Sequence, residues 1–195
     1  MGRPKSSTRL GHTSTDGRQG VRQAYVFEQR FFRENLNLGE GGETGEDNRI
    51  LEETYHRTGV SIMGKRVFEG GEQAWPEEAP FHTPVFVLTN EVRDPWERPG
   101  GTTFQFVNGG VESALRQARD GAGGRDIRIA GGADVIIQYL NAGMVDEFSI
   151  ALVSVLFGRG LRLFAGIGPS GILLEIVETT NSWMVTHLTY AVRRR

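Results

Sequence analysis

The chain has 195 residues, a formal net charge of -2 and 38% hydrophobic residues, the ordinary composition of one soluble globular domain. It contains no cysteine, which excludes a disulfide framework, a thiolate metal site and a cysteine nucleophile. The pI is near 6.1 and basic residues are scattered among acidic ones, so no surface for nucleic acid is predicted. We therefore expect a cytoplasmic protein.

Neither a membrane span nor an export signal is predicted. The longest mostly apolar run, residues 148–157, is far shorter than the roughly 20 residues of a spanning helix. Its β-branched residues favour a buried strand. Residues 1–20 lack the apolar stretch of a signal peptide and hold few large apolar side chains. We expect them to form an atypical, flexible N-terminal segment, followed by a single domain over residues 21–195.

The apolar spacing predicts a series of elements along the chain. Residues 25–36 are typical of an amphipathic helix, residues 39–45 of a flexible glycine-rich loop, and residues 47–57 of a second helix. Thr44 is expected to cap this second helix and Gly59 to end it. Strands are then predicted at 60–63, 84–89, 103–107, 126–130, 145–157, 172–178 and 183–192, and helices at 64–71, 110–120 and 133–140.

Strands and helices that alternate in this way predict a mostly parallel sheet covered on both faces. The last strands follow one another without helices between them, which favours antiparallel pairing at the C-terminal edge. The predicted fold is therefore a three-layer α/β/α domain.

The segment from Arg128 to Leu140 carries the most chemical information. A predicted strand passes there through Gly131 and Gly132 into a helix, which leaves backbone N–H groups and the positive end of the helix dipole at the carboxyl edge of the sheet. Glycine lets a phosphate oxygen approach the backbone, so the corner suits an anion, although tight packing explains it as well. The segment is not G-x-G-x-x-G, which disfavours a standard dinucleotide fold.

Two further strand ends carry side chains that suit a phosphate. Lys65 and Arg66 follow Gly64 at the start of a short helix, where the helix dipole disfavours cations. A bound phosphate, such as the 2′-phosphate of NADP, would compensate them, and solvated surface charges are the alternative. Thr89 and Asn90 offer a hydroxyl and an amide after the next strand. The carboxyl ends of parallel strands meet at one edge, so the three strand ends together predict a phosphate-binding edge.

Four segments in register resemble the dihydrofolate reductase superfamily: residues 63–69 (MGKRVFE), 85–90 (VFVLTN), 129–140 (IAGGADVIIQYL) and 145–164. The chain is most similar to the branch that holds the reductase domain of the riboflavin-biosynthesis protein RibD and stand-alone proteins like its C-terminal domain. The resemblance covers residues 21–192. It implies the dihydrofolate reductase-like fold, NADPH as cofactor, and hydride transfer to a small pyrimidine or pterin-like heterocycle, as in 5-amino-6-(5-phosphoribosylamino)uracil reductase. It also implies a homodimer.

The resemblance also implies which residues hold NADPH. Gly64 and Lys65 match the family residues that contact a phosphate, with Arg66 as a neighbour that shares this role. Thr89 and Asn90 match the polar pair on the adenosine side.

The pyrophosphate is assigned by the same resemblance to the glycine corner. Gly131 and Gly132 match the family's double glycine, and Ala133 and Asp134 begin the helix that follows it. The Asp134 carboxylate has a second possible role, because an acid at a helix start also caps backbone N–H groups.

The N-terminus departs from the family pattern. Relatives begin with an apolar strand that runs into S-x-D-G, whereas this chain has only Ser14, Asp16 and Gly17 of that motif, after a polar segment. A strand over residues 5–8 at the centre of a sheet would bury hydroxyls and an amine, which is unfavourable unless they are paired. The usual first strand is therefore not predicted.

Hydride transfer to a C=N bond is helped by a group that protonates the nitrogen, such as a partly buried carboxylic acid with a raised pKa. Asp16 is the first candidate by motif, and Glu28 on the first predicted helix is the second. A solvated helix carboxylate is the alternative for Glu28. The four histidines, His12, His56, His82 and His187, show no ligand spacing, so no metal site is predicted.

Two functions remain open from sequence. The first is an NADPH-dependent reductase, and the second is a catalytically impaired nucleotide-binding or dimeric ligand-binding protein that retains the fold. The apolar C-terminal strands would support a dimer by pairing across a two-fold axis. An ordered strand near Asp16 would favour the enzyme.

Overall fold

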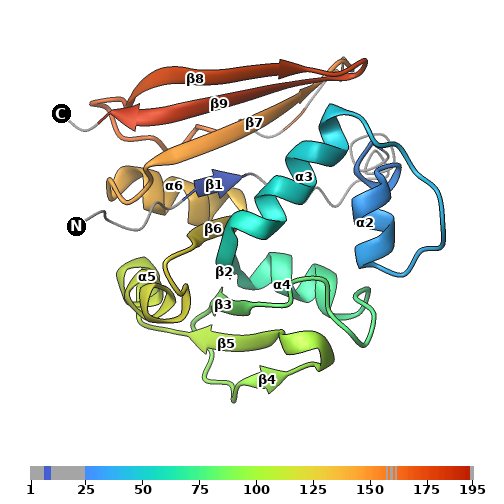
Figure 1. Ribbon diagram of the computed structural model, residues 1–195. Helices are drawn as coiled ribbons and strands as arrows, with labels where there is room; N and C mark the ends of the chain where they lie inside the picture. The colour runs from blue at the N-terminus through green and yellow to red at the C-terminus, as the bar shows by residue number, and fades with distance from the viewer. Residues whose placement is uncertain (1–6, 10–24, 157, 159, 161, 194–195) are drawn as a thin grey trace.

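The computed structural model describes residues 7–9, 25–156, 158, 160 and 162–193 (Figure 1). The strands are β1 (Ser7–Arg9), β2 (Thr58–Gly64), β3 (Pro84–Leu88), β4 (Trp96–Glu97), β5 (Thr103–Val107), β6 (Asp126–Gly131), β7 (Glu147–Val153), β8 (Leu173–Asn181) and β9 (Val185–Arg193). The helices are α2 (Arg30–Asn35), α3 (Glu46–Arg57), α4 (Lys65–Glu72), α5 (Gly110–Gly121) and α6 (Ala133–Asn141).

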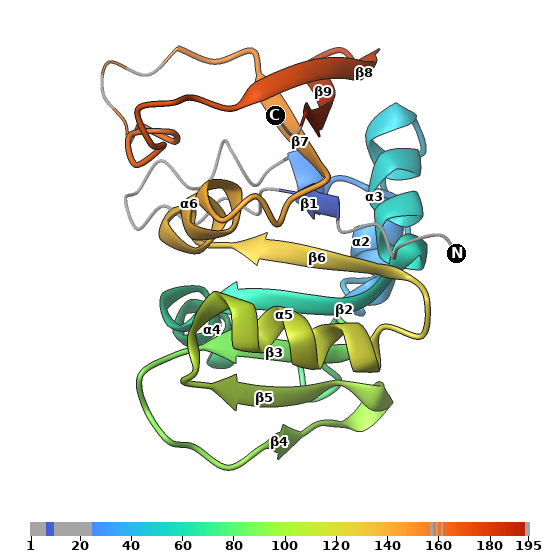
Figure 2. The same cartoon turned by 90° about the vertical axis from the view of Figure 1, so that its left-hand side faces the viewer.

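The strands form two sheets that lie side by side. One has the order β4-β5-β3-β2-β6 and the other β1-β7-β9-β8, and β1 lies beside β6 (Figure 2). Strands β5, β3, β2 and β6 are parallel, and β1 is parallel to β7. Strands β8 and β9 are antiparallel at the C-terminal edge. The predicted sheet is confirmed.

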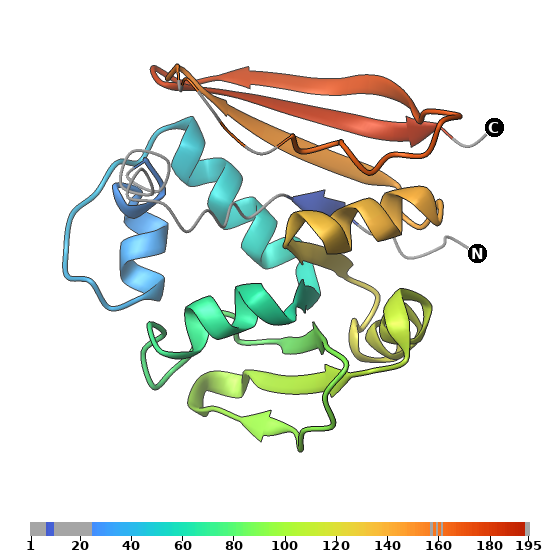
Figure 3. The same ribbon diagram turned by 180° about the vertical axis from the view of Figure 1, so that it is seen from behind.

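Helices cover both faces of the sheet. Helices α5 and α6 lie on one face, and α3 and α4 lie on the other, as the views from the front and from behind show (Figures 1 and 3). The predicted three-layer α/β/α arrangement is therefore confirmed. In the described part of the chain, no helix has the length and apolar character that crossing a membrane requires.

Strand β2 lies at the centre of the parallel sheet and is buried along its whole length. Val60 and Ile62 belong to the apolar cluster that includes α5 and α6, whereas Met63 belongs to the cluster around Phe68 of α4. Parallel strands buried on both faces have nearly continuous apolar sequences, which is why their positions could be predicted.

The helix predicted over residues 25–36 is interrupted. The backbone N–H of Glu43 donates to the carbonyl of Glu28, and the N–H of Arg30 donates to the carbonyl of Glu43. These bonds take the place of helical ones, so α2 begins only at Arg30. Gly42 makes the close approach possible, because a Cβ there would lie 2.7 Å from the backbone nitrogen of Arg30. The glycine-rich loop, which was expected to be flexible, is thus held to the segment before α2 by these two backbone hydrogen bonds.

The helix predicted over residues 47–57 is confirmed as α3, but the two residues predicted to cap and end it are wrong. The N-cap of α3 is Gly45, not Thr44. At the other end the helix passes directly into β2, with Thr58 as C-cap, and Gly59 lies inside the strand. A Cβ at Gly59 would lie 2.3 Å from the carbonyl oxygen of Ala122, so this glycine is required by packing against the end of α5.

The strand predicted over residues 145–157 is shorter than expected and only partly buried. It forms β7 over Glu147–Val153, and in its apolar run Phe148 is 3% exposed while Leu152 is 59% exposed. Only part of β7 is covered by other elements, so the long apolar run does not mark a fully buried strand. The two-residue strand β4 was not predicted.

The N-terminal segment, residues 1–20, lies outside the described residues except for β1. Ser7–Arg9 pairs in parallel with Glu147, Phe148 and Ser149 of β7. A short strand therefore stands at the position where the sequence predicted none, because backbone pairing does not require apolar side chains.

Candidate functional site

The three predicted strand ends do meet at one edge of the sheet. Gly64 at the end of β2 pairs in register with Leu88 of β3, and Met63 pairs with Gly131 of β6. The backbone N–H of Thr89 donates to the carbonyl of Val107, 3.1 Å away, which ties the end of β3 to that of β5. The carboxyl ends of four parallel strands thus form one continuous edge.

At this edge the two glycine corners pack against each other. A Cβ at Gly64 would lie 3.0 Å from Cγ2 of Val135 and 3.8 Å from the backbone nitrogen of Gly132. Gly131 has a φ of 127°, in the region that favours glycine, and the peptide bond between Gly131 and Gly132 is cis. The end of β2 therefore packs closely against the Val135 side chain of α6 and the backbone of the Gly131–Gly132 corner, and a side chain at Gly64 would disturb this contact.

Gly132 is the N-cap of α6, so the backbone N–H groups of the first helical turn lie at the edge. Ala133 and Asp134 in that turn are exposed. Among the described residues the Asp134 carboxylate accepts no hydrogen bond, and only its backbone carbonyl is used, by the Gln138 side chain 3.2 Å away. The alternative role of Asp134 as a helix cap is thus not seen in the described part of the chain.

Lys65 begins α4 directly after Gly64, and carboxylates surround it. Its ammonium donates a hydrogen bond to Glu91 and lies 3.4 Å from Glu69, and the bond with Glu91 raises the pKa of Lys65. The negative groups that the helix start was predicted to need are thus supplied within the chain.

The remaining predicted cofactor residues lie at the same edge with few contacts. Arg66 and Asn90 are exposed, and the described residues form no ion pair with Arg66. The Thr89 hydroxyl accepts a hydrogen bond from the backbone N–H of Glu91, 3.1 Å away, which shapes the turn after β3.

A small recess of about 50 Å³ lies between α4 and the ends of β3 and β5. Lys65, Thr89 and Glu91 line it, together with Arg93. The Arg93 guanidinium lies 4.5 Å from the ring centre of Phe106 and 2.5 Å from the Glu72 carboxylate. An aromatic and charged recess therefore lies next to the Gly64 corner, because Lys65 lines the recess and directly follows Gly64.

A family model, the RibD C-terminal domain, matches residues 13–187. The chain belongs to the RibD C-terminal domain family. The matched range contains all the predicted site residues and all the described elements from α2 to β8.

Solved structures show that the chain has the family's fold. A crystal structure from Shewanella sp. PV-4, provisionally named a riboflavin biosynthesis protein, superposes with a TM-score of 0.63 and 20% identity, covering 97% of this chain and 99% of that one. A Thermotoga maritima deaminase and 5-amino-6-(5-phosphoribosylamino)uracil reductase gives 0.59 and 14%, covering 97% and 57%. Dihydrofolate reductase from Enterococcus faecalis, complexed with NADP(H), gives 0.50 and 16%, covering 97% of each chain.

One curated relative is similar in sequence. The uncharacterized protein YyaP of Bacillus subtilis (strain 168) is 33% identical over 86 residues, which are 44% of this chain and 45% of YyaP. The match therefore spans less than half the length of that relative.

Of the two predicted acids in this RibD C-terminal domain, only Glu28 lies among the described residues. Asp16 lies outside the described residues. Glu28 is described, but it stands in the turn before α2 and not on a helix, and its side chain is exposed. The partly buried carboxylic acid that protonation calls for is therefore not found at Glu28.

A buried carboxyl group is found instead at Asp47, which the sequence did not single out. Asp47 lies in the first turn of α3, and its Oδ1 is 2.5 Å from Nε2 of His187 on β9. The side chains are 8% and 13% exposed. His187 thus has a carboxylate partner, which the sequence did not predict. No spacing signal could have shown this pair, because the residues are 140 positions apart.

Tyr25 extends this buried polar group. Burial raises the pKa of the Tyr25 phenol, the negative charge of Asp47 raises it further, and Arg128 on β6 acts in the opposite direction. Titratable side chains from four separate segments thus interact with one another, an arrangement frequent at functional sites.

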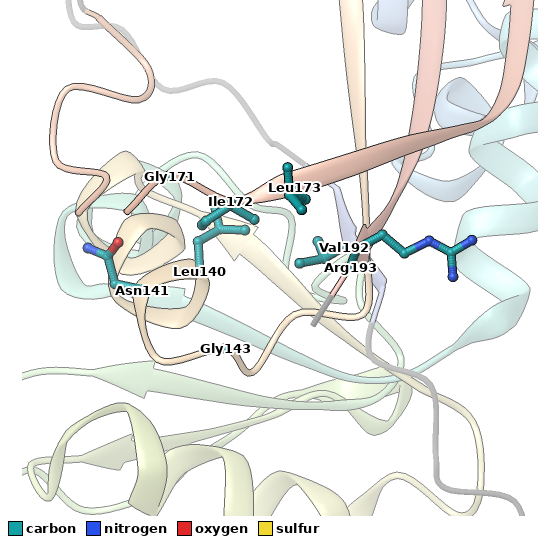
Figure 4. A pocket seen from close by; sticks show the side chains of 8 residues that line it. All are labelled: Leu140, Asn141, Gly143, Gly171, Ile172, Leu173, Val192 and Arg193. Atoms are coloured by element: carbon teal, nitrogen blue, oxygen red, sulfur yellow. The ribbon is translucent and has the colours of Figure 1, made fainter. Parts of the chain in front are cut away.

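A pocket of about 250 Å³ lies elsewhere, between the C-terminal end of α6 and strands β8 and β9 (Figure 4). Leu140, Ile172 and Val192 line it, and its one charged residue, Arg193, pairs with Glu175. The glycine corner lies at the opposite end of α6, so this pocket does not belong to the predicted edge. In the described part of the chain, no three His, Asp or Glu side chains group as metal ligands.

Proposed function

We propose that this chain is an NADPH-dependent reductase that transfers hydride to a small heterocyclic substrate of the pyrimidine or pterin class. The observation that carries the proposal is the contact between Gly64 and the Gly131–Gly132 corner at the carboxyl edge, with Lys65 beside it. Family membership, the reductase activity named for the Thermotoga protein, and the NADP(H) bound to the Enterococcus enzyme support it.

The residues at the edge fit a dinucleotide. Backbone N–H groups at the start of α6 suit a pyrophosphate, and a Cβ at Gly64 would fill the space between the two corners. Gly131, Gly132, Ala133 and Asp134 would hold the pyrophosphate, while Lys65, Arg66, Thr89 and Asn90 would hold the adenosine end. NADPH supplies the hydride when bound.

A proton must reach the substrate nitrogen as the hydride arrives. Asp16 keeps its candidacy from the S-x-D-G motif, and Asp47 meets the requirement for a buried acid. In the Asp47 alternative, the 2.5 Å hydrogen bond with His187 fixes the orientation of the Asp47 carboxyl group. The variants Asp16→Asn and Asp47→Asn separate these alternatives, because loss of the true proton donor removes the fall in rate that is expected as the pH rises.

The second candidate function is nucleotide or ligand binding without turnover. The polar first segment favours it, since the family's apolar strand is missing from the sequence. The presence of β1 between β6 and β7 favours the enzyme, because a strand stands where the polar sequence predicted none.

Titration with NADPH and NADH, followed by quenching of tryptophan fluorescence, tests the proposal. We expect micromolar NADPH binding that weakens at least tenfold when Lys65→Ala and Arg66→Ala are combined, and weaker binding of NADH. Arg119→Ala on α5 is the matched control, because it removes a cation without touching the edge. If neither nucleotide binds the wild-type chain, the reductase proposal is wrong.

A substrate screen then distinguishes the two candidate functions. Consumption of NADPH with pyrimidine or pterin-like acceptors would support the enzyme, whereas tight nucleotide binding without turnover would support the binding protein.

A further inference from the structure

The recess between α4 and the ends of β3 and β5 has an unusual charge balance for a phosphate site. Lys65 and Arg93 are its two cations, and Glu69, Glu72 and Glu91 are three carboxylates. A site for the 2′-phosphate of NADPH normally presents uncompensated cations, whereas a carboxylate in such a place normally receives the ribose 2′-hydroxyl of NADH.

Both cations of the recess are already paired. Lys65 donates to Glu91 and lies near Glu69, and Arg93 pairs with Glu72 at 2.5 Å. The Arg93 guanidinium is also fixed between aromatic rings, 5.1 Å from the centre of Phe68 and 4.5 Å from that of Phe106. Lys65 is therefore the cation that can change partner.

The Lys65–Glu91 pair is open to solvent, with side-chain exposures of 38% and 63%. Exposed ion pairs contribute little to stability and exchange partners readily. The backbone N–H of Glu91 is bonded to the Thr89 hydroxyl, which keeps the carboxylate close to the turn where the adenosine end is expected.

We propose that Glu91 is a specificity-determining residue that competes with the 2′-phosphate of NADPH for Lys65 and thereby lowers the preference for NADPH over NADH. The inference rests on the proposed function, because it places the adenosine end of the coenzyme at this recess. Glu91 must leave Lys65 before a phosphate takes its place, so the loss of the old ion pair offsets part of the gain from the new one. A coenzyme without that phosphate leaves the pair intact.

Calorimetric titration with adenosine 2′,5′-bisphosphate and with 5′-AMP tests the inference, because these probes differ only in the 2′-phosphate. In Glu91→Gln we expect the bisphosphate to bind three- to tenfold more tightly and 5′-AMP to change by less than twofold. Glu112→Gln on α5 changes the net charge equally but lies outside the recess, so it should leave both affinities unchanged.

A double variant separates competition from a general charge effect. When Lys65→Gln is combined with Glu91→Gln, the gain for the bisphosphate should fall to less than twofold, because the cation for which Glu91 competes is absent. A gain that persists without Lys65 overturns the proposal.

The remaining outcomes are distinct. If Glu91→Gln leaves the ratio of the two affinities unchanged, Glu91 does not determine specificity, while the proposed reductase function stands. Weaker 5′-AMP binding in the variant would mean that Glu91 receives the ribose hydroxyl, which also overturns the proposal. Absence of binding for both probes and for NADPH would reject the proposed function itself.

Discussion

The Nε2 atom of His187 lies 2.5 Å from Oδ1 of Asp47, so that a hydrogen bond joins β9 to the first turn of α3. Both side chains are buried, and a buried charge that loses its partner is strongly destabilising. The pair therefore contributes to the stability of the fold as well as to the candidate chemistry.

Replacing Asp47 by Asn should lower the free energy of unfolding by about 2 kcal/mol, because a hydrogen bond to a charged group becomes a neutral one. Urea denaturation measures the change. Glu46→Gln is the matched control in the same helical turn, since Glu46 is exposed and pairs with Arg49 at the surface. An equal effect of the two substitutions would contradict the role given to the buried pair.

Gly132→Ala should separate coenzyme binding from stability. A Cβ at Gly132 would lie 3.6 Å from Cγ2 of Val67, an ordinary contact, so the melting temperature should change little. The methyl group would stand where a pyrophosphate approaches the backbone, and we expect the Kd for NADPH to rise at least tenfold. Gly70→Ala on α4 has open space around it and should leave the Kd unchanged.

The stability of the fold should decrease in alkaline solution. Burial raises the pKa of the Tyr139 phenol, which donates a hydrogen bond to the Val111 carbonyl at 2.9 Å. The unfolded chain loses this proton near pH 10 while the folded chain keeps it. The contribution of Tyr139 to the free energy of unfolding is therefore constant below about pH 10 and falls above it.

Tyr139→Phe tests this pH dependence. The variant should lose about 1 kcal/mol at pH 7, since the Val111 carbonyl loses its donor. It should also show a shallower decline above pH 10 in urea denaturation. A decline as steep as that of the wild type would assign the alkaline sensitivity to other groups, such as Tyr25.

The homodimer implied by the resemblance has a candidate surface on β8. This strand is at the end of its sheet, and Ile176 and Val177 are 61% and 59% exposed. Two identical edge strands pair antiparallel about a two-fold axis, which would cover the backbone edge and these side chains. We expect Ile176→Glu to convert the dimer to a monomer in light scattering. Leu156→Glu, at a fully exposed site outside β8, should not.

The parallel strands could be predicted because each is short and has apolar residues at its buried positions. The glycine corners were equally visible, since Gly64, Gly131 and Gly132 each lie between a strand and a helix. Local patterns of this kind determine local structure, and the edge where they meet follows from the rule that parallel strands share one carboxyl edge.

Other features depend on contacts between distant segments and could not be predicted. The interruption of the first helix results from backbone pairing with Glu43, and the Asp47–His187 pair joins residues far apart in the sequence. At Lys65, the neighbour Glu69 follows at helical spacing, but Glu91 reaches the ammonium only because β3 lies beside β2.

The direct passage from α3 into β2 has a mechanical consequence. Helix α3 ends at Arg57 and β2 begins at Thr58, whose hydroxyl donates to the carbonyl of Thr54 in the last helical turn at 2.6 Å. No loop at this junction can serve as a hinge. Asp47 near the start of α3 and Gly64 at the end of β2 are therefore joined without an intervening loop, and any motion that separates them must bend the central strand or unwind the end of the helix.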